Sequence, residues 1–280
     1  MADHGLPILY ALFLWWFSTG LILYLDGLPR RTFRLSMLGA SALAIAALYG
    51  LAQSADDASP RGAYMAFTCG LLAWGWHEIS FLMGVVTGPL RTACPSDCTG
   101  WRRLWHAVQT ILWHELAIAA TGGLIAWLTW GGANQVGLWT FLVLWVMRLS
   151  AKLNVYLGVP NLTEEFLPAH LTYLKSVMRR RPMNLLFPLS VTAATVAATH
   201  LIDLAVSADD GSFEAVAFTF VSTFLALAIL EHWFLVLPLQ DAALWRWALR
   251  SRAAGSTEEP ADTLPAMAAY ATLSPAGRRR

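Results

Sequence analysis

The chain has 280 residues, of which 57% are hydrophobic and only 13% are charged. Soluble domains carry roughly 25% charged residues, so this composition excludes an ordinary soluble globular protein and is typical of a chain whose surface faces lipid. The formal net charge of +1 gives no support to a nucleic-acid partner.

Seven apolar segments follow one another along the chain. Each has about the 20 residues that a membrane-spanning helix needs. They cover residues 7–25, 35–53, 64–88, 104–130, 138–158, 185–207 and 216–239. Backbone polar groups must be satisfied internally in lipid, so each segment is predicted to be helical. The predicted fold class is all-α, a polytopic transmembrane helical bundle of about seven spanning helices.

Basic residues gather on alternate connections between these segments. The connections after the first, third and fifth segments, together with the C-terminal region, hold 16 of the 19 Lys and Arg residues. We expect an inner-membrane protein, and the positive-inside rule then predicts that its N-terminus lies on the outer, periplasmic side and its C-terminus in the cytoplasm. Residues 1–250 are expected to form a single seven-helix domain. Residues 251–280, rich in Ala, Ser, Thr, Glu and Pro, are expected to be a disordered cytoplasmic tail.

Four of the predicted spans carry ionisable or amide side chains in their cytoplasmic halves. These are His77 and Glu78, His114 and Glu115, Arg148, Lys152 and Asn154, and Glu231 and His232. Counted from the cytoplasmic ends, the three acids and Lys152 fall within a band roughly 8 Å deep at 1.5 Å per residue. Charge is costly at this depth, so these groups are expected to face inward and meet one another.

Two interpretations of this meeting stay open. In the first, the acids pair with Arg148 and Lys152 and only hold helices together. In the second, the same groups line a site for a ligand, a pigment or a metal such as iron, manganese or zinc. The metal candidates are His77, Glu78, His114, Glu115, Glu231 and His232. Adjacent residues point about 100° apart on a helix, so the members of a pair need not face one centre.

Two connections add further candidates. The segment 159–184 carries Glu164, Glu165 and His170. Either Asn161 or Thr163 caps a short helix with the two acids in its first turn, or the two acids and His170 fold against the cytoplasmic mouth of the polar band. Cys94 and Cys98 form a CxxxC spacing with no second Cys/His pair nearby, so their role as a zinc or redox pair stays undecided.

Several stretches resemble a known family. They are FLWWFSTG (13–20), WGWHE (74–78), VTGP (86–89), WVMRLSAKLN (145–154), LGVPNLTEEFLP (157–168), RRRPMN (179–184) and LEHWFLVLP (230–238). The chain from about residue 12 to residue 249 is similar to the PuhE family, also called photosynthetic complex assembly protein 2.

The resemblance implies a function as well as a membrane location. It implies a factor of the photosynthetic inner membrane that helps assemble the reaction centre and core antenna, by handling bacteriochlorophyll, its precursors or nascent subunits. Expected partners are reaction-centre or core-antenna subunits, or pigment-synthesis proteins. The family supplies no catalytic residues to carry over. The alternative from the residues is a membrane-embedded enzyme that uses the His/Glu band on a tetrapyrrole or another lipid-soluble substrate. A transporter is less favoured, because no inverted repeat is visible.

Overall fold

The computed structural model describes residues 2–162, 164–238 and 241–255 and is helical throughout, with no strand among them. Seven long helices are α1 (Ala2–Asp26), α2 (Phe33–Ser54), α3 (Pro60–Leu82), α4 (Gly100–Leu128), α5 (Val136–Leu157), α6 (Leu186–Ser207) and α7 (Phe213–Phe234). Short 3-10 helices η1 (Arg30–Thr32), η2 (Glu164–Phe166), η3 (Ala169–Val177) and η4 (Asp241–Trp245) lie in the connections, and α8 (Arg246–Gly255) follows. The predicted all-α bundle is confirmed.

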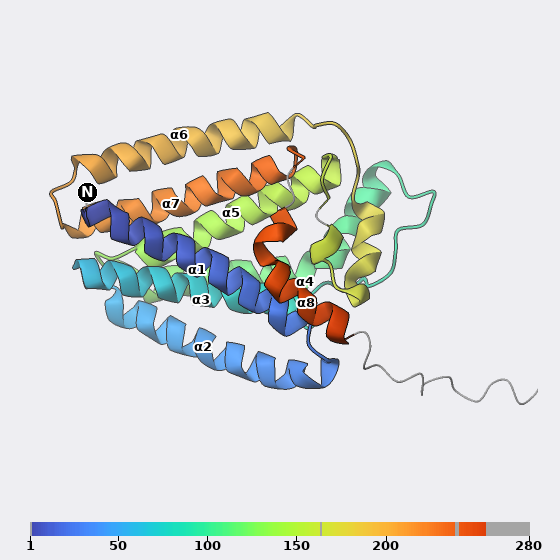
Figure 1. Ribbon diagram of the computed structural model, residues 1–280, viewed down its shortest axis with the longest axis horizontal. Coiled ribbons are helices and arrows are strands. Elements are labelled where there is room, and N and C mark those ends of the chain that lie inside the picture. Colours follow the sequence, from blue (N-terminus) through green and yellow to red (C-terminus); the bar gives the residue numbers. More distant parts are fainter. Residues whose placement is uncertain (1, 163, 239–240, 256–280) are drawn as a thin grey trace, which may run out of the picture.

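Figure 1 shows the seven long helices running side by side, with α2 and α6 at opposite edges and α1, α3, α5 and α7 between them. Helix α3 contacts α1, α2, α4, α5 and α7. The largest buried cluster lies where these helices meet, and Phe67 of α3 stacks on Phe220 of α7 with ring centroids 4.2 Å apart. Helix α3 therefore forms the centre of the bundle.

Six of the long helices are long and apolar enough to cross a membrane, which identifies a multi-pass membrane protein. The seventh, α3, has sufficient length, but Trp76, His77 and Glu78 lower its mean hydropathy. Its neighbours shield it, and most of the apolar side chains that the structure exposes lie on the outer surface of the other helices. Examples are Leu6, Leu35, Leu38, Trp127, Leu189 and Val206.

Helices α2, α3 and α5 approach one another closely through glycine. A Cβ atom added at Gly70 would lie 2.6 Å from the carbonyl oxygen of Gly137. One added at Gly137 would lie 2.2 Å from Leu51 and 2.7 Å from the carbonyl oxygen of Ala66. Small residues give membrane helices this close contact, because lipid supplies no hydrophobic force between helices.

Helix α3 ends at Leu82, earlier than the prediction of residue 88. Gly84 adopts a left-handed conformation (φ 72°) and donates to the carbonyl oxygen of Phe81, and Val85 donates to that of Ser80. This Schellman pattern satisfies the last carbonyl groups of the helix and turns the chain away. The apolar residues beyond Gly84 extended the hydropathy signal without extending the helix.

The α3–α4 connection then lies directly on α4. A Cβ atom at Gly88 would lie 2.0 Å from the carbonyl oxygen of Gln109, so only glycine fits this contact. One residue earlier, the carbonyl oxygen of Thr87 accepts a hydrogen bond from the His114 amide at 2.8 Å. The connection is thereby fixed beneath the polar residues of α4.

Beyond the seven long helices, α8 packs across α1. The Trp245 indole donates to the carbonyl oxygen of Trp16 at 2.9 Å, and the Trp16 indole donates to that of Leu244 at 3.0 Å. These two contacts belong to η4. Helix α8 follows η4 directly and continues to Gly255, past the domain boundary expected at residue 250. The rest of the predicted disordered tail, residues 256–280, lies outside the described residues.

Candidate functional site

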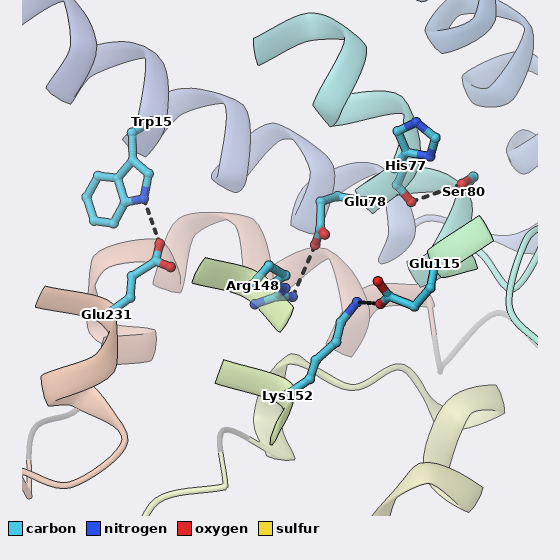
Figure 2. Close-up of polar contacts among 8 residues, drawn as sticks. All are labelled: Trp15, His77, Glu78, Ser80, Glu115, Arg148, Lys152 and Glu231. Atoms are coloured by element: carbon cyan, nitrogen blue, oxygen red, sulfur yellow. Dashed lines mark hydrogen bonds and ion pairs between the residues drawn. The ribbon is translucent and has the colours of Figure 1, made fainter. Parts of the chain in front are cut away.

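The predicted polar residues of α3, α4 and α5 meet inside the bundle (Figure 2). Arg148 donates to Glu78 at 3.1 Å, and Lys152 donates to Glu115 at 2.7 Å. The Glu78, Glu115 and Lys152 side chains are only 14%, 19% and 22% exposed, whereas Arg148 is 45% exposed. Three different helices are therefore joined by two ion pairs, and we call these four residues the charged cluster.

Two of the acids also accept hydrogen bonds from tryptophan side chains. The Trp145 indole donates to Glu115 at 3.1 Å, on the carboxylate oxygen that Lys152 does not bind. On the far side, the Trp15 indole of α1 donates to Glu231 of α7 at 2.8 Å. Figure 2 shows Arg148 between this Trp–Glu contact and Glu78. Nothing in the sequence indicated that the indole N–H groups of these two tryptophans serve the acids.

Two fully buried histidines lie beside the charged cluster. The centroids of the His77 and His114 rings are 6.4 Å apart. The Phe81 ring packs against the His114 ring, with centroids 4.6 Å apart. His77 Nε2 is 3.0 Å from the Thr121 hydroxyl. His77 Nδ1 and both ring nitrogens of His114 have no hydrogen-bond partner among the described residues. A buried polar atom without a partner is uncommon and needs an explanation.

His232 and Asn154, which were also predicted to belong to the site, make their hydrogen bonds apart from the charged cluster. His232 Nδ1 donates to the carbonyl oxygen of Ala228 at 2.8 Å, and its Nε2 lies 2.9 Å from Ser150 Oγ. Asn154 donates to the carbonyl oxygen of Ser150 at 3.0 Å. His232 thus points away from the contact made by Glu231, as the 100° step between adjacent helical residues allows.

The loop residues do not join the charged cluster. Glu164 pairs within its own segment, with Lys175 at 3.0 Å and Arg180 at 3.5 Å, and Glu165 is exposed. His170 packs against Gly84 and the Phe33 ring. Glu164 and Glu165 lie in the first turn of the short helix η2, which agrees with the short-helix interpretation of this segment.

The six metal candidates of the sequence do not form a three-ligand group. In the part of the chain that the structure describes, such a group is made by Cys94, Cys98 and His106. Cys94 and Cys98 are joined in a disulfide, and His106 Nε2 is 2.9 Å from the carbonyl oxygen of Thr92. The two sulfur atoms are therefore bonded to each other, and the imidazole nitrogen contacts the backbone.

An apolar groove runs between α2, α3 and α4 next to the cluster. Its volume is about 290 Å³, and His77 and Thr121 are among the residues that line it. Trp76 forms one wall and donates to Ser41 at 3.0 Å, and Ala44 lines the α2 side. Thr121 was not among the predicted site residues, although it lies seven residues after His114 and therefore on the same face of the helix.

Comparisons with known proteins extend over nearly the whole chain. A family model described as protein of unknown function (DUF3623) matches residues 1–256. An uncharacterized 30.4 kDa protein in the puhA 5′ region of Rhodobacter capsulatus is 44% identical over 269 residues, covering 94% of this chain and 96% of that protein. No solved structure matches.

Proposed function

We propose that this chain, which belongs to the DUF3623 family, is an integral membrane factor for assembly of the bacterial photosynthetic reaction centre and core antenna. Two observations of relatedness support the proposal. The chain resembles the PuhE family, and its relative from Rhodobacter capsulatus is named for the puhA 5′ region. The proposed location is the photosynthetic inner membrane, and the proposed partners are subunits of these complexes or pigment-synthesis proteins.

The groove at His77 is the observation that carries the pigment-handling form of the proposal. Its volume of about 290 Å³ is close to the lower end of ligand pockets, roughly 300–1,000 Å³. Its walls are apolar and aromatic, which suits the edge of a flat chlorin or an isoprenoid chain. His77 is the residue that would bind the magnesium of such a cargo, and its Nδ1 has no partner among the described residues.

The charged cluster supports a holding role over a catalytic one. Glu115 and Lys152 are bonded to each other, and the second oxygen of Glu115 is occupied by Trp145. Groups engaged in this way lock helices together and leave little freedom for proton transfer to a substrate. We infer that the cluster fixes the position of α3, and with it the shape of the groove.

A complementation experiment tests the proposal. A deletion strain receives the wild-type gene, Ala44→Phe, which fills the groove, or Ala42→Phe, which places the same ring on the exposed face of α2. Wild type and Ala42→Phe are expected to restore assembled complexes on native gels, and Ala44→Phe to leave the strain at the level of the deletion. Full restoration by Ala44→Phe at equal protein level would contradict the groove as the working surface.

One observation favours the second candidate, a membrane enzyme acting on a tetrapyrrole or another lipid-soluble substrate. His114 is fully buried with both ring nitrogens unpartnered among the described residues, and Glu78 Oε1 is in the same condition. Such groups could serve as acid, base or metal ligands. The same deletion strain separates the two functions, because an enzyme leaves an accumulated pigment precursor, whereas an assembly factor leaves normal pigment with unassembled complexes.

A further inference from the structure

A second pocket lies at the arginine-rich end of the bundle. It has a volume of about 200 Å³ and forms where the α1–α2 connection, the α3–α4 connection and η3 come together. Arg30 and Arg91 contribute two guanidinium groups from different connections, and His170 contributes an imidazole. The pocket is separate from the groove at His77 and shares no lining residue with it.

The pocket is electropositive. No acidic residue lines it among the described residues. Other basic residues of this end differ in this respect, because Arg102 pairs with Asp97, and Lys175 and Arg180 pair with Glu164. Arg30 and Arg91 thus bring two positive charges to a pocket whose lining, among the described residues, includes no acid.

Two buried hydroxyl groups in the pocket wall lack hydrogen-bond partners. Thr87 is 1% exposed, and its Oγ1 has no partner among the described residues. The Tyr173 hydroxyl, also in the wall, is buried and in the same condition. An unsatisfied buried polar group is unfavourable, so both are explained if a bound group accepts hydrogen bonds from them.

The shape of the wall is fixed by backbone contacts. A Cβ atom at Gly84 would lie 2.9 Å from the His170 ring, so the left-handed glycine allows the imidazole to approach. The Thr87 carbonyl is bonded to the His114 amide, which holds this residue in place. Phe33 and Leu171 give the pocket an apolar side next to its charged one.

We propose that this pocket binds a phosphate group. Arginine pairs with phosphate through parallel N–H donors, and hydroxyl donors complete the contacts of its oxygens. Arg30, Arg91, Thr87 and Tyr173 supply both kinds of donor around one cavity. The phosphate comes either from the headgroup of an anionic phospholipid, whose chains would follow the apolar side, or from a soluble phosphate.

Binding to the purified full-length protein tests the proposal. The protein in neutral detergent is titrated with phosphatidylglycerol mixed micelles, with phosphatidylcholine micelles and with inorganic phosphate, at about 0.15 M salt to screen exposed charges. The double variant Arg30→Gln/Arg91→Gln is compared with Arg34→Gln/Arg102→Gln, which removes the same charge from exposed residues of the same end that do not line the pocket.

Saturable binding that weakens at least about tenfold in the pocket double variant, and less than twofold in the control, supports the proposal. Thr87→Val and Tyr173→Phe keep the shape and are expected to weaken binding by about two- to tenfold each, which provides a test if the double variant does not fold. Binding of phosphatidylglycerol alone identifies a lipid headgroup, and equal binding of inorganic phosphate identifies a soluble ligand. Equal loss in both double variants, or no saturable binding of either probe, overturns the proposal.

Discussion

At the scale of single residues, Glu115 shows how the bundle tolerates a carboxylate among apolar helices. One oxygen accepts from Lys152 and the other from Trp145, so both are satisfied by α5. The acid belongs to α4, and the contacts therefore join α4 to α5. An unpaired charge at this position would be strongly unfavourable.

Lys152→Met is expected to lower the stability of the folded protein. It leaves Glu115 with only the Trp145 donor, and breaking a buried pair costs about 3–5 kcal/mol. Because both side chains are about one-fifth exposed, we expect a loss nearer 2–3 kcal/mol once solvent screening is allowed for. The measurement is thermal unfolding and monodisperse yield in detergent.

Two comparisons make this measurement specific. Adding Glu115→Gln to Lys152→Met should recover much of the loss, because the unpaired charge is removed. Lys175→Met breaks an exposed pair with Glu164 and should change stability by less than about 1 kcal/mol. Unchanged stability of Lys152→Met would show that Lys152 does not neutralise the acid.

The sequence predicted that these groups meet but not which partners they choose. Counting residues from the helix ends gave their common depth, and the structure joins Glu78 to Arg148 and Glu115 to Lys152. Pairing depends on how each helix is rotated about its axis, and the weak amphipathicity of lipid-facing helices leaves that rotation undetermined. For the same reason the sequence did not separate His232 from Glu231.

At the scale of elements, Arg103 connects three segments at the end of the bundle. It is 5% exposed and donates to the carbonyl oxygens of Tyr156 at the end of α5 and Val177 at the end of η3. Its guanidinium also lies 4.0 Å from the Tyr156 ring centre. The sequence counted Arg103 among the basic residues of a connection, and only the fold shows that it is buried.

Arg103→Gln is expected to loosen η3, because the charge-assisted hydrogen bond to the Val177 carbonyl is lost, a bond worth about 1.5–3 kcal/mol. Hydrogen exchange followed by mass spectrometry should show faster exchange across residues 169–177. Arg102→Gln is the matched control, because Arg102, the preceding residue, is exposed and pairs with exposed Asp97. Identical exchange in both variants would mean that η3 is held by its apolar contacts alone.

Hydropathy predicted the number of helices and most of their ends, but it did not predict the short elements. The third span was extended too far because Val85 and Val86 are apolar, although Gly84 turns the chain before them. Helix η3 was missed because its residues are held by packing of Leu171 and Leu174 under Phe81, a contact between distant parts of the chain. Turn and 3-10 elements of this kind depend on tertiary contacts that a local window does not contain.

At the scale of the whole molecule, the charge asymmetry predicts the orientation. Seven helices place the two ends of the described chain at opposite ends of the bundle, as Figure 1 shows for α1 and α8. Arg30, Arg91 and Arg102 lie at the end that is predicted to face the cytoplasm, whereas the α6–α7 connection carries Asp209 and Asp210.

Cysteine labelling checks this orientation. In a Cys69→Ala/Cys94→Ser/Cys98→Ser background, Asp210→Cys should react with a membrane-impermeant maleimide in spheroplasts, and Arg34→Cys should react only after the membrane is permeabilised. Both positions are exposed, so access to the reagent is limited by the membrane and not by packing. The reverse pattern would place the arginine-rich end in the periplasm.

The central position of α3 has a consequence for how the protein is made. This helix is the least lipid-compatible of the seven, since the six that are apolar enough to cross a membrane do not include it. Its His77 and Glu78 find their partners on α4 and α5, which leave the ribosome later. During synthesis the polar groups of α3 therefore lack these partners until α4 and α5 have been made, and α3 must stay beside α2 or within the insertion machinery in the meantime. The order of translation thus makes stable insertion of α3 a cooperative event of the whole bundle.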